Sequence, residues 1–196
     1  MRYRQLFTKT WEGKQKVGFV MYDKDRNRWA KVGTTARLIS FDTKPDGKIM
    51  TLGEGDERFR VLKVTRIGSQ MEYMKALVEY IDDENTEEDL KPLEENVWES
   101  LKQVLSLSNE LYGKKLDLKD SLKSLAPRKS YNMGKKPLRS EIVRQRLFSF
   151  AVAQVLDMPL LEQQSLLQVQ DTKERFRREM GMLEMAQQFL TAQVSL

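Results

Sequence analysis

Two Gly-Lys-Lys triplets are the segments of this sequence that come nearest to a phosphate-binding loop. They occupy residues 113–115 and 134–136. A Walker A loop needs a further glycine at fixed spacing upstream and a serine or threonine directly after the lysine, so that backbone amides and a hydroxyl reach the phosphates and magnesium. Neither triplet has these neighbours. The sequence therefore predicts no nucleotide cofactor.

The chain also lacks the side chains on which most catalytic and metal sites depend. Its 196 residues include no histidine and no cysteine. Histidine is the usual proton carrier near neutral pH, and the two residues dominate catalytic triads and structural zinc sites. A serine–lysine dyad stays open on composition, but no such pair stands out. We therefore predict that the protein is not an enzyme and binds no metal or other cofactor.

A basic loop at residues 127–137 is the first candidate site for a partner. Its four cations and one aromatic residue are Arg128, Lys129, Tyr131, Lys135 and Lys136. Cations attract phosphates and an aromatic ring can stack on a base, so the loop is a candidate contact for nucleic acid. A solvated loop without a ligand is the commoner role for a charge cluster of this size.

Tyr22 and Trp29 form the second candidate site, because they flank a charged turn at residues 23–27. An exposed aromatic pair would anchor the side chains of a protein partner, whereas a buried pair would belong to the core. Both alternatives stay open. Three methionines near the end of the chain pose the same choice between an adaptable contact surface and core, and we favour core for Met180, Met182 and Met185.

The composition is that of an ordinary globular chain with a mild excess of positive charge. Hydrophobic residues make up 40% and charged residues 32%, and the net charge is +5. That excess suits a solubilising surface, and it also permits contact with nucleic acid or peripheral association with an anionic membrane. No apolar run approaches the ~20 residues that span a bilayer, and no hydrophobic stretch follows the first residues. We predict neither a transmembrane segment nor secretion.

The front half of the chain has the pattern of short strands joined by turns. Strands are expected at residues 16–22, 33–41, 48–52, 58–65 and 71–81, with turns at 23–27, 44–47 and 53–56. Pro45 and Gly47 suit the second of these turns, and the two glycines at 53 and 55 mark the third as a hairpin turn. Five short strands with tight turns predict a small antiparallel barrel or sandwich.

The back half has helical periodicity. A helix capped by Asn85 or Thr86 is expected to end at Gly113, and a short helix lies within residues 116–125. Residues 138–156 are apolar nearly all round in their second half and predict a central buried helix. Further helices begin at Pro159 and at Asp171 or Thr172. The sequence therefore predicts an α+β protein, with a β-rich part at residues 1–85 and a helical part at 86–196.

Two groups of residues resemble the N-terminal, substrate-recognition domain of Lon proteases. They are residues 32–38 (VGTTARL), 46–47 (DG) and 57–62 (ERFRVL), then 162–167 (EQQSLL) with Asp171, Thr172 and Arg175. The chain is most similar to the stand-alone members of cyanobacteria and plastids, without ATPase or protease domains. The resemblance implies a PUA-like antiparallel β-barrel or sheet, a C-terminal α-helical bundle, and a non-catalytic role in recognising polypeptides or as an adaptor.

The resemblance also implies a protein partner and a place in the plastid (chloroplast), or otherwise the cytoplasm. Two alternatives stay open: an accessory subunit of a larger plastid assembly, and an RNA-binding PUA-like module. The family usually opens with a strand rich in Leu, Pro and Phe, which is expected to be missing here. A barrel without its first strands has an unpaired edge. The amphipathic residues 1–15 are therefore expected to dock as a helix, and the edge to be closed by a partner or an extension.

Overall fold

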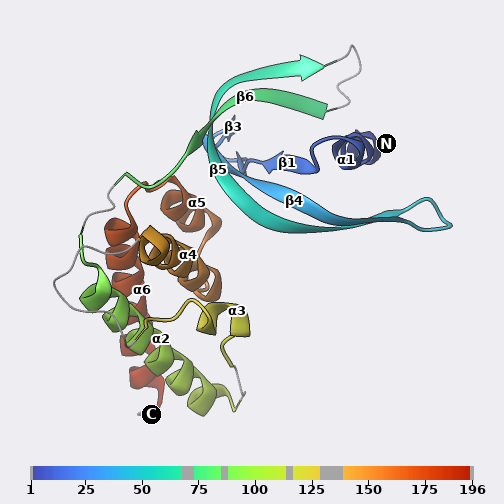
Figure 1. Ribbon diagram of the computed structural model, residues 1–196. Helices are drawn as coiled ribbons and strands as arrows, with labels where there is room; N and C mark the ends of the chain where they lie inside the picture. The colour runs from blue at the N-terminus through green and yellow to red at the C-terminus, as the bar shows by residue number, and fades with distance from the viewer. Residues whose placement is uncertain (1, 68–72, 85–87, 114–116, 129–138, 195–196) are drawn as a thin grey trace. The chain divides into compact units, whose positions relative to one another are not determined.

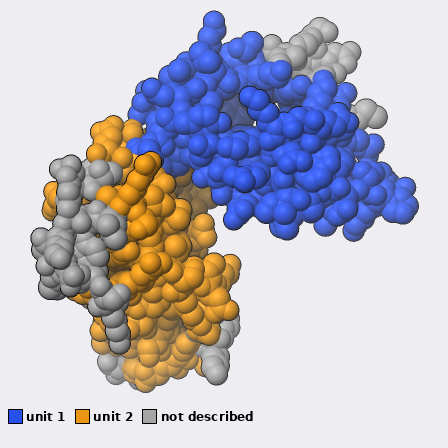
Figure 2. Space-filling model, in the orientation of Figure 1, with its two compact units in different colours: residues 1–82 blue, residues 83–196 orange. Residues whose placement is uncertain are grey.

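The computed structural model describes residues 2–67, 73–84, 88–113, 117–128 and 139–194 (Figure 1). The described chain divides into two compact units, which Figure 2 colours separately: unit 1 is residues 1–82 and unit 2 is residues 83–196. The boundary expected at residue 85 lies outside the described residues. The α+β class predicted from the sequence is confirmed, since strands fill unit 1 and helices fill unit 2.

Unit 1 holds an antiparallel sheet of four strands in the order β1-β4-β5-β6 and a separate two-stranded ribbon, β2–β3. Its elements are α1 (Arg2–Glu12), β1 (Lys16–Phe19), β2 (Tyr22–Asp23), β3 (Arg28–Trp29), β4 (Val32–Thr43), β5 (Ile49–Ile67) and β6 (Tyr73–Ile81). Of the predicted barrel or sheet, the structure has the antiparallel sheet, which is not closed into a barrel. Among the described strands β1 and β6 are the two edges, and no ladder joins them.

The hairpin turn predicted at residues 53–56 is wrong, because this segment lies inside the continuous strand β5. Gly53 pairs with Leu38 and Gly55 pairs with Ala36, and the register shifts on either side of these pairs. Glycines inside a strand often mark such bulges, since they tolerate the local distortion of the ladder. By contrast, the turn predicted before β5 is confirmed: Gly47 has φ 77°, in the left-handed region that glycine enters without strain.

Phe59 is the centre of the small core of unit 1 and is almost fully buried. Its ring packs over Gly33, where a β-carbon would lie 2.7 Å from the ring and 2.3 Å from the Phe19 carbonyl oxygen. Only glycine fits at this position. Because a residue without a side chain leaves room for the ring, the strand pair β4–β5 can close tightly around Phe59.

Helix α1 docks on the sheet, as expected for an amphipathic N-terminal segment. The rings of Trp11 and Phe41 stack with centroids 5.8 Å apart, and the Arg4 guanidinium donates to the Gly47 carbonyl oxygen at 2.5 Å. Figure 1 shows the β4–β5 hairpin and the β5–β6 pair diverging as two arms, with α1 and β1 between them. The helix therefore covers one face of the sheet.

Unit 2 contains α2 (Lys91–Tyr112), α3 (Asp120–Lys123), α4 (Arg139–Val155), α5 (Leu160–Gln168) and α6 (Thr172–Val194). Helix α2 begins later than predicted, with Pro92 in its first turn and the Lys91 amide donating to the Asp89 carboxylate at 3.1 Å. It ends at Gly113, as predicted. The main core cluster of buried apolar residues joins these helices through Leu90, Val97, Leu101, Leu122, Phe148, Val152, Phe176 and Leu183.

Helix α4 is less buried than its sequence predicted. Phe148 and Val152 are fully buried, but Leu147 on the opposite side is 46% exposed and Phe150 is half-buried. Met180 packs against the core, as favoured, whereas Met185 is 64% exposed. Within the described ranges, no helix is both long enough and apolar enough to cross a membrane.

Candidate functional site

The structure brings the two aromatic candidates together. Tyr22 and Trp29 are cross-strand partners in the β2–β3 ribbon, with ring centroids 4.7 Å apart, and they are 41% and 48% exposed. They are therefore not barrel core. The Tyr22 hydroxyl also donates to Asn27, which holds the ring over the turn. The pair is preorganised on the surface, beside the exposed cation Arg28.

Of the basic loop, only Arg128 lies among the described residues, and it is exposed. Lys129, Tyr131, Lys135 and Lys136 lie outside them. The chain is fixed directly before the loop, because Arg144 of α4 donates to the carbonyl oxygens of Leu125 and Ala126.

A larger surface that the sequence did not predict lies on the sheet of unit 1. Thr51 pairs with Phe41, whose ring packs on α1, so both side chains lie on the face toward α1. Met50 and Leu52, the chain neighbours of Thr51, therefore point to the opposite face. On β6, Tyr73 lies beside Lys9 of α1. Side chains alternate along β6, so Met74, Ala76 and Tyr80 lie on the face away from α1. Val64 lies on the same face, because it pairs with Ala76. We call this the apolar sheet surface: Met50, Leu52, Val64, Met74 and Tyr80, each 45–59% exposed.

A paired cation lies beside this surface, and unit 1 as a whole has an excess of positive charge. Lys16 of β1 forms ion pairs of 2.6 Å with both Asp56 and Glu57, whose hydrogen bonds raise its pKa, and its ammonium lies 5.9 Å from the centre of the Tyr80 ring. Unit 1 carries 17 lysines and arginines against 11 aspartates and glutamates, whereas unit 2 carries 17 against 18. The net charge of the chain therefore comes from unit 1.

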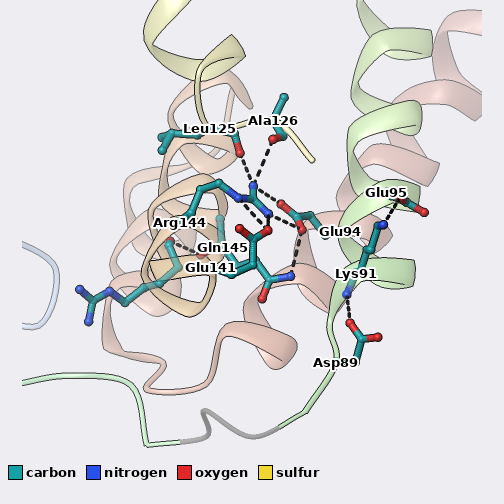
Figure 3. A network of polar contacts seen from close by, with 11 residues as sticks. Asp89, Lys91, Glu94, Glu95, Leu125, Ala126, Glu141, Arg144 and Gln145 are labelled. Atoms are coloured by element: carbon teal, nitrogen blue, oxygen red, sulfur yellow. Dashed lines mark hydrogen bonds and ion pairs between the residues drawn. The ribbon is translucent and has the colours of Figure 1, made fainter. Parts of the chain in front are cut away.

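The most elaborate polar cluster of unit 2 is closed to solvent. Arg144 forms a bidentate pair with Glu94, at 2.5 and 2.8 Å, and binds Glu141 as well, while the Gln145 amide donates to Glu94 at 3.0 Å (Figure 3). Burial lowers the pKa of Arg144, but the bonds from Glu94 and then Glu141 outweigh it and raise the pKa overall. The residue stays charged, and the network joins α2 to α4 rather than forming an accessible site.

A second buried cation is Arg175, which belongs to the group Asp171, Thr172 and Arg175 on which part of the family resemblance rests. The Arg175 guanidinium donates to Asp83 at 2.9 Å, to the Val169 carbonyl oxygen at 2.8 Å and to the Ser149 hydroxyl at 2.9 Å. Thr172 accepts a further bond from Arg175 at 2.8 Å and donates to Asp83. The ion pair between Asp83 and Arg175 could not be found from the sequence, because a contact across 92 positions leaves no local signal.

No group of three or more His, Cys, Asp or Glu residues that could hold a metal ion exists in the part of the chain that the structure describes. The exposed groups of unit 1 are apolar and aromatic side chains beside cations, which suit contact with another macromolecule.

The chain consists of an open, partly apolar sheet followed by a helical bundle, and this architecture is that of a known family of substrate-binding domains. The model of the ATP-dependent protease La (LON) substrate-binding domain matches residues 1–185, and the chain belongs to this family. The predicted resemblance is thereby confirmed.

A solved structure also supports the fold. A Lon N-terminal domain protein from Xanthomonas campestris is similar with a TM-score of 0.56 and 17% identity, over 90% of this chain and 81% of that one. The N-terminal domain of Mycobacterium avium complex Lon protease aligns with a TM-score of 0.49 and 11% identity, over 86% of this chain and 89% of that one. A comparison with curated proteins gave no match.

Proposed function

We propose that this chain is a non-catalytic recognition module that binds unfolded polypeptide segments on the apolar sheet surface of unit 1. The observation that carries the proposal is the exposure of large apolar side chains, Leu52, Val64, Met74 and Tyr80 among them, on the face of the sheet away from α1. Burying apolar area releases roughly 25 cal/mol per Å². Folded proteins hide such groups, and unfolded ones expose them.

Two further features support polypeptides as the ligand. The family is named for substrate binding in an ATP-dependent protease, whose substrates are proteins. Met50 and Met74 are unbranched and flexible, so they adapt to different side chains, as surfaces with several partners require. An adaptor of this kind would hold clients without changing them chemically.

The test is binding of a fluorescent, reduced and alkylated protein that cannot fold, followed by anisotropy. The double variant Leu52→Ser/Met74→Ser should weaken binding about 5-fold or more, because it removes two exposed contacts of the surface. The control Leu160→Ser changes an equally exposed leucine of α5, in unit 2, and should leave binding unaltered. If the wild-type protein binds the folded and unfolded forms equally, the proposal is wrong.

The alternative of an accessory subunit in a larger plastid assembly predicts a different set of partners. Affinity purification followed by mass spectrometry should recover many unfolded clients for a recognition module and one stoichiometric complex for a structural subunit. We propose a plastid location on the resemblance alone, and a fluorescent fusion of the protein expressed from its own gene tests it.

RNA binding is the weaker alternative, favoured by the positive charge of unit 1 and by the exposed pair Tyr22 and Trp29. Cations and stacking aromatic rings are the two parts of a single-strand binding surface. Anisotropy with labelled oligouridylate at two salt concentrations tests it. Binding that falls steeply with salt and is lost in Trp29→Ala would favour this function over polypeptide recognition.

A further inference from the structure

Strand β6 is an open edge of the sheet. It pairs with β5 over its whole length, from Tyr73 opposite Ile67 to Ile81 opposite Arg58. On its other side no strand of the described chain forms a ladder with it. Alternate residues of β6 therefore direct their backbone N–H and C=O groups away from β5, into a position where another strand would pair.

This edge has few of the features that protect edge strands. Natural edges are usually short, or carry proline, bulges and several lysines. Strand β6 is nine residues long, has the sequence YMKALVEYI and contains one lysine and no proline. Leu77 is 63% exposed and Tyr80 is 54% exposed. Helix α1 comes close to β6, where Lys9 lies over the Tyr73 ring at 5.6 Å, and Lys16 of β1 lies over the Tyr80 ring at 5.9 Å.

The two faces of β6 differ in character, which defines the strand that would fit beside it. One face, with Met74 and Tyr80, continues the apolar sheet surface. The other carries Lys75, Leu77 and Glu79, and the Glu79 carboxylate is paired with Arg60 of β5 at 3.0 Å. Lys63 of β5 pairs with Leu77, and Lys9 of α1 lies over the neighbouring Tyr73 ring, so cations are in excess on this face. These three lysines are exposed and make no ion pair among the described residues. The matching strand therefore alternates apolar side chains on one face with acidic side chains on the other.

We propose that β6 binds its ligand by strand addition: an extended polypeptide segment, alternating apolar and acidic residues, pairs with the free edge and extends the sheet. The proposal rests on the function proposed for unit 1 and deepens it. Backbone bonds supply affinity that does not depend on sequence, and the two faces supply the preference. A client is recognised by its extended conformation and by its alternation, not by one fixed motif.

Hydrogen exchange of backbone amides, followed by NMR on the full chain, tests the pairing. Two probes are used: the reduced and alkylated protein described above, and a nine-residue peptide of alternating valine and glutamate. A peptide of equal composition with valines and glutamates in separate blocks is the control. Bound to either alternating or unfolded probe, β6 should show slowed exchange at alternate residues, while the block peptide should leave β6 unchanged.

A charge reversal sharpens the test without touching the fold. Lys75→Glu should weaken binding of the alternating peptide by about 3- to 10-fold, because it places an acidic group opposite the acidic face. Lys44→Glu makes an equal change of charge at the exposed β4–β5 turn and should alter binding by less than about 2-fold.

The outcomes separate the two proposals. If the unfolded protein binds and β6 amides exchange as fast as in the free chain, strand addition is wrong and the proposed recognition function stands. If neither the unfolded protein nor the alternating peptide binds, both proposals are wrong.

Discussion

The two units of this protein differ in the side chains that they bury: unit 2 buries charged groups, and unit 1 exposes apolar ones. Unit 2 encloses charged side chains such as Arg144 and Arg175 in complete networks around a continuous apolar core. Unit 1 leaves apolar side chains such as Leu52 and Tyr80 in solvent, on an open sheet with few buried residues. Buried ion pairs demand a fixed geometry, whereas exposed apolar groups can accept a partner. The contrast supports the proposal that unit 1 holds the binding surface and that unit 2 is the rigid scaffold.

Of the predicted changes, removal of a buried cation should lower the free energy of unfolding of unit 2 most. Arg175→Met leaves Asp83 enclosed without its counter-charge, and we expect unit 2 to lose about 3–5 kcal/mol of stability. Urea unfolding measured by circular dichroism checks this. Arg178→Met, which removes an exposed ion pair on the same helix, should cost no more than about 1 kcal/mol. Equal losses would show that Arg175 is not buried.

Two alanine variants of neighbouring residues in α4 test whether one side of the helix is buried and another is exposed. Phe148→Ala empties a fully buried position and should cost about 3–5 kcal/mol. Leu147→Ala, one residue away and half exposed, should cost about 1 kcal/mol or less. Denaturant melts that rank the two variants in the reverse order would mean that α4 packs through its other side.

Glu179 should impose a pH dependence on the stability of unit 2. Its carboxylate oxygens are buried and accept no hydrogen bond in the described structure. Burial raises the pKa of Glu179 well above its usual 4.5, against the opposing charge of Arg175. The folded state therefore binds a proton more tightly than the unfolded state, so this contribution is complete below pH 4.5 and is lost as pH rises toward the folded pKa.

The variant Glu179→Gln removes this titration. It should match the wild type near pH 4 and exceed its stability by about 1–3 kcal/mol at pH 8. Thermal or urea unfolding across that range, with both proteins in the same buffers, measures the difference. A stability difference that does not change with pH would contradict burial of the acid.

Substitutions in the apolar sheet surface should change the free energy of unfolding least, and they should instead change dye binding and self-association. Leu52→Ser/Met74→Ser should change the free energy of unfolding by only about 0.5 kcal/mol, because both side chains are exposed. The wild type should bind a hydrophobic dye and self-associate at micromolar concentration through its open edge, and the double variant should do so less. A monodisperse wild type that leaves the dye silent would contradict an available surface.

Local signals in the sequence predicted many elements correctly. Gly113 ends α2, Thr172 begins α6, and the turn at Gly47 joins β4 to β5, because each depends on the conformational preferences of a few neighbouring residues. Features set by distant contacts were not predictable. Two glycines marked a turn where β5 continues through a bulge, and the partner of Arg175 lies far away in the sequence.

The candidate site was only partly predictable for the same reason. Tyr22 and Trp29 were identifiable because they flank one turn. The apolar sheet surface was not, since an apolar residue in a strand has the same pattern whether its face is covered or open. Phe150 illustrates the limit in unit 2: the apolar run around it predicted full burial, but Phe148 and Val152 lie in the main core cluster whereas Phe150 is half-buried. Burial belongs to the packing of elements, which periodicity alone does not determine.

Photo-crosslinking is the most direct test of the central proposal, in which unit 1 binds unfolded polypeptides and unit 2 serves as a scaffold that does not contact them. An unfolded, alkylated protein carrying photoreactive groups is bound to the full chain, irradiated and digested, and the linked peptides are identified by mass spectrometry. The account predicts crosslinks concentrated in residues 49–52, 64 and 73–81 of unit 1. Crosslinks that fall mainly on the helices of unit 2, with these segments unlabelled, would contradict it.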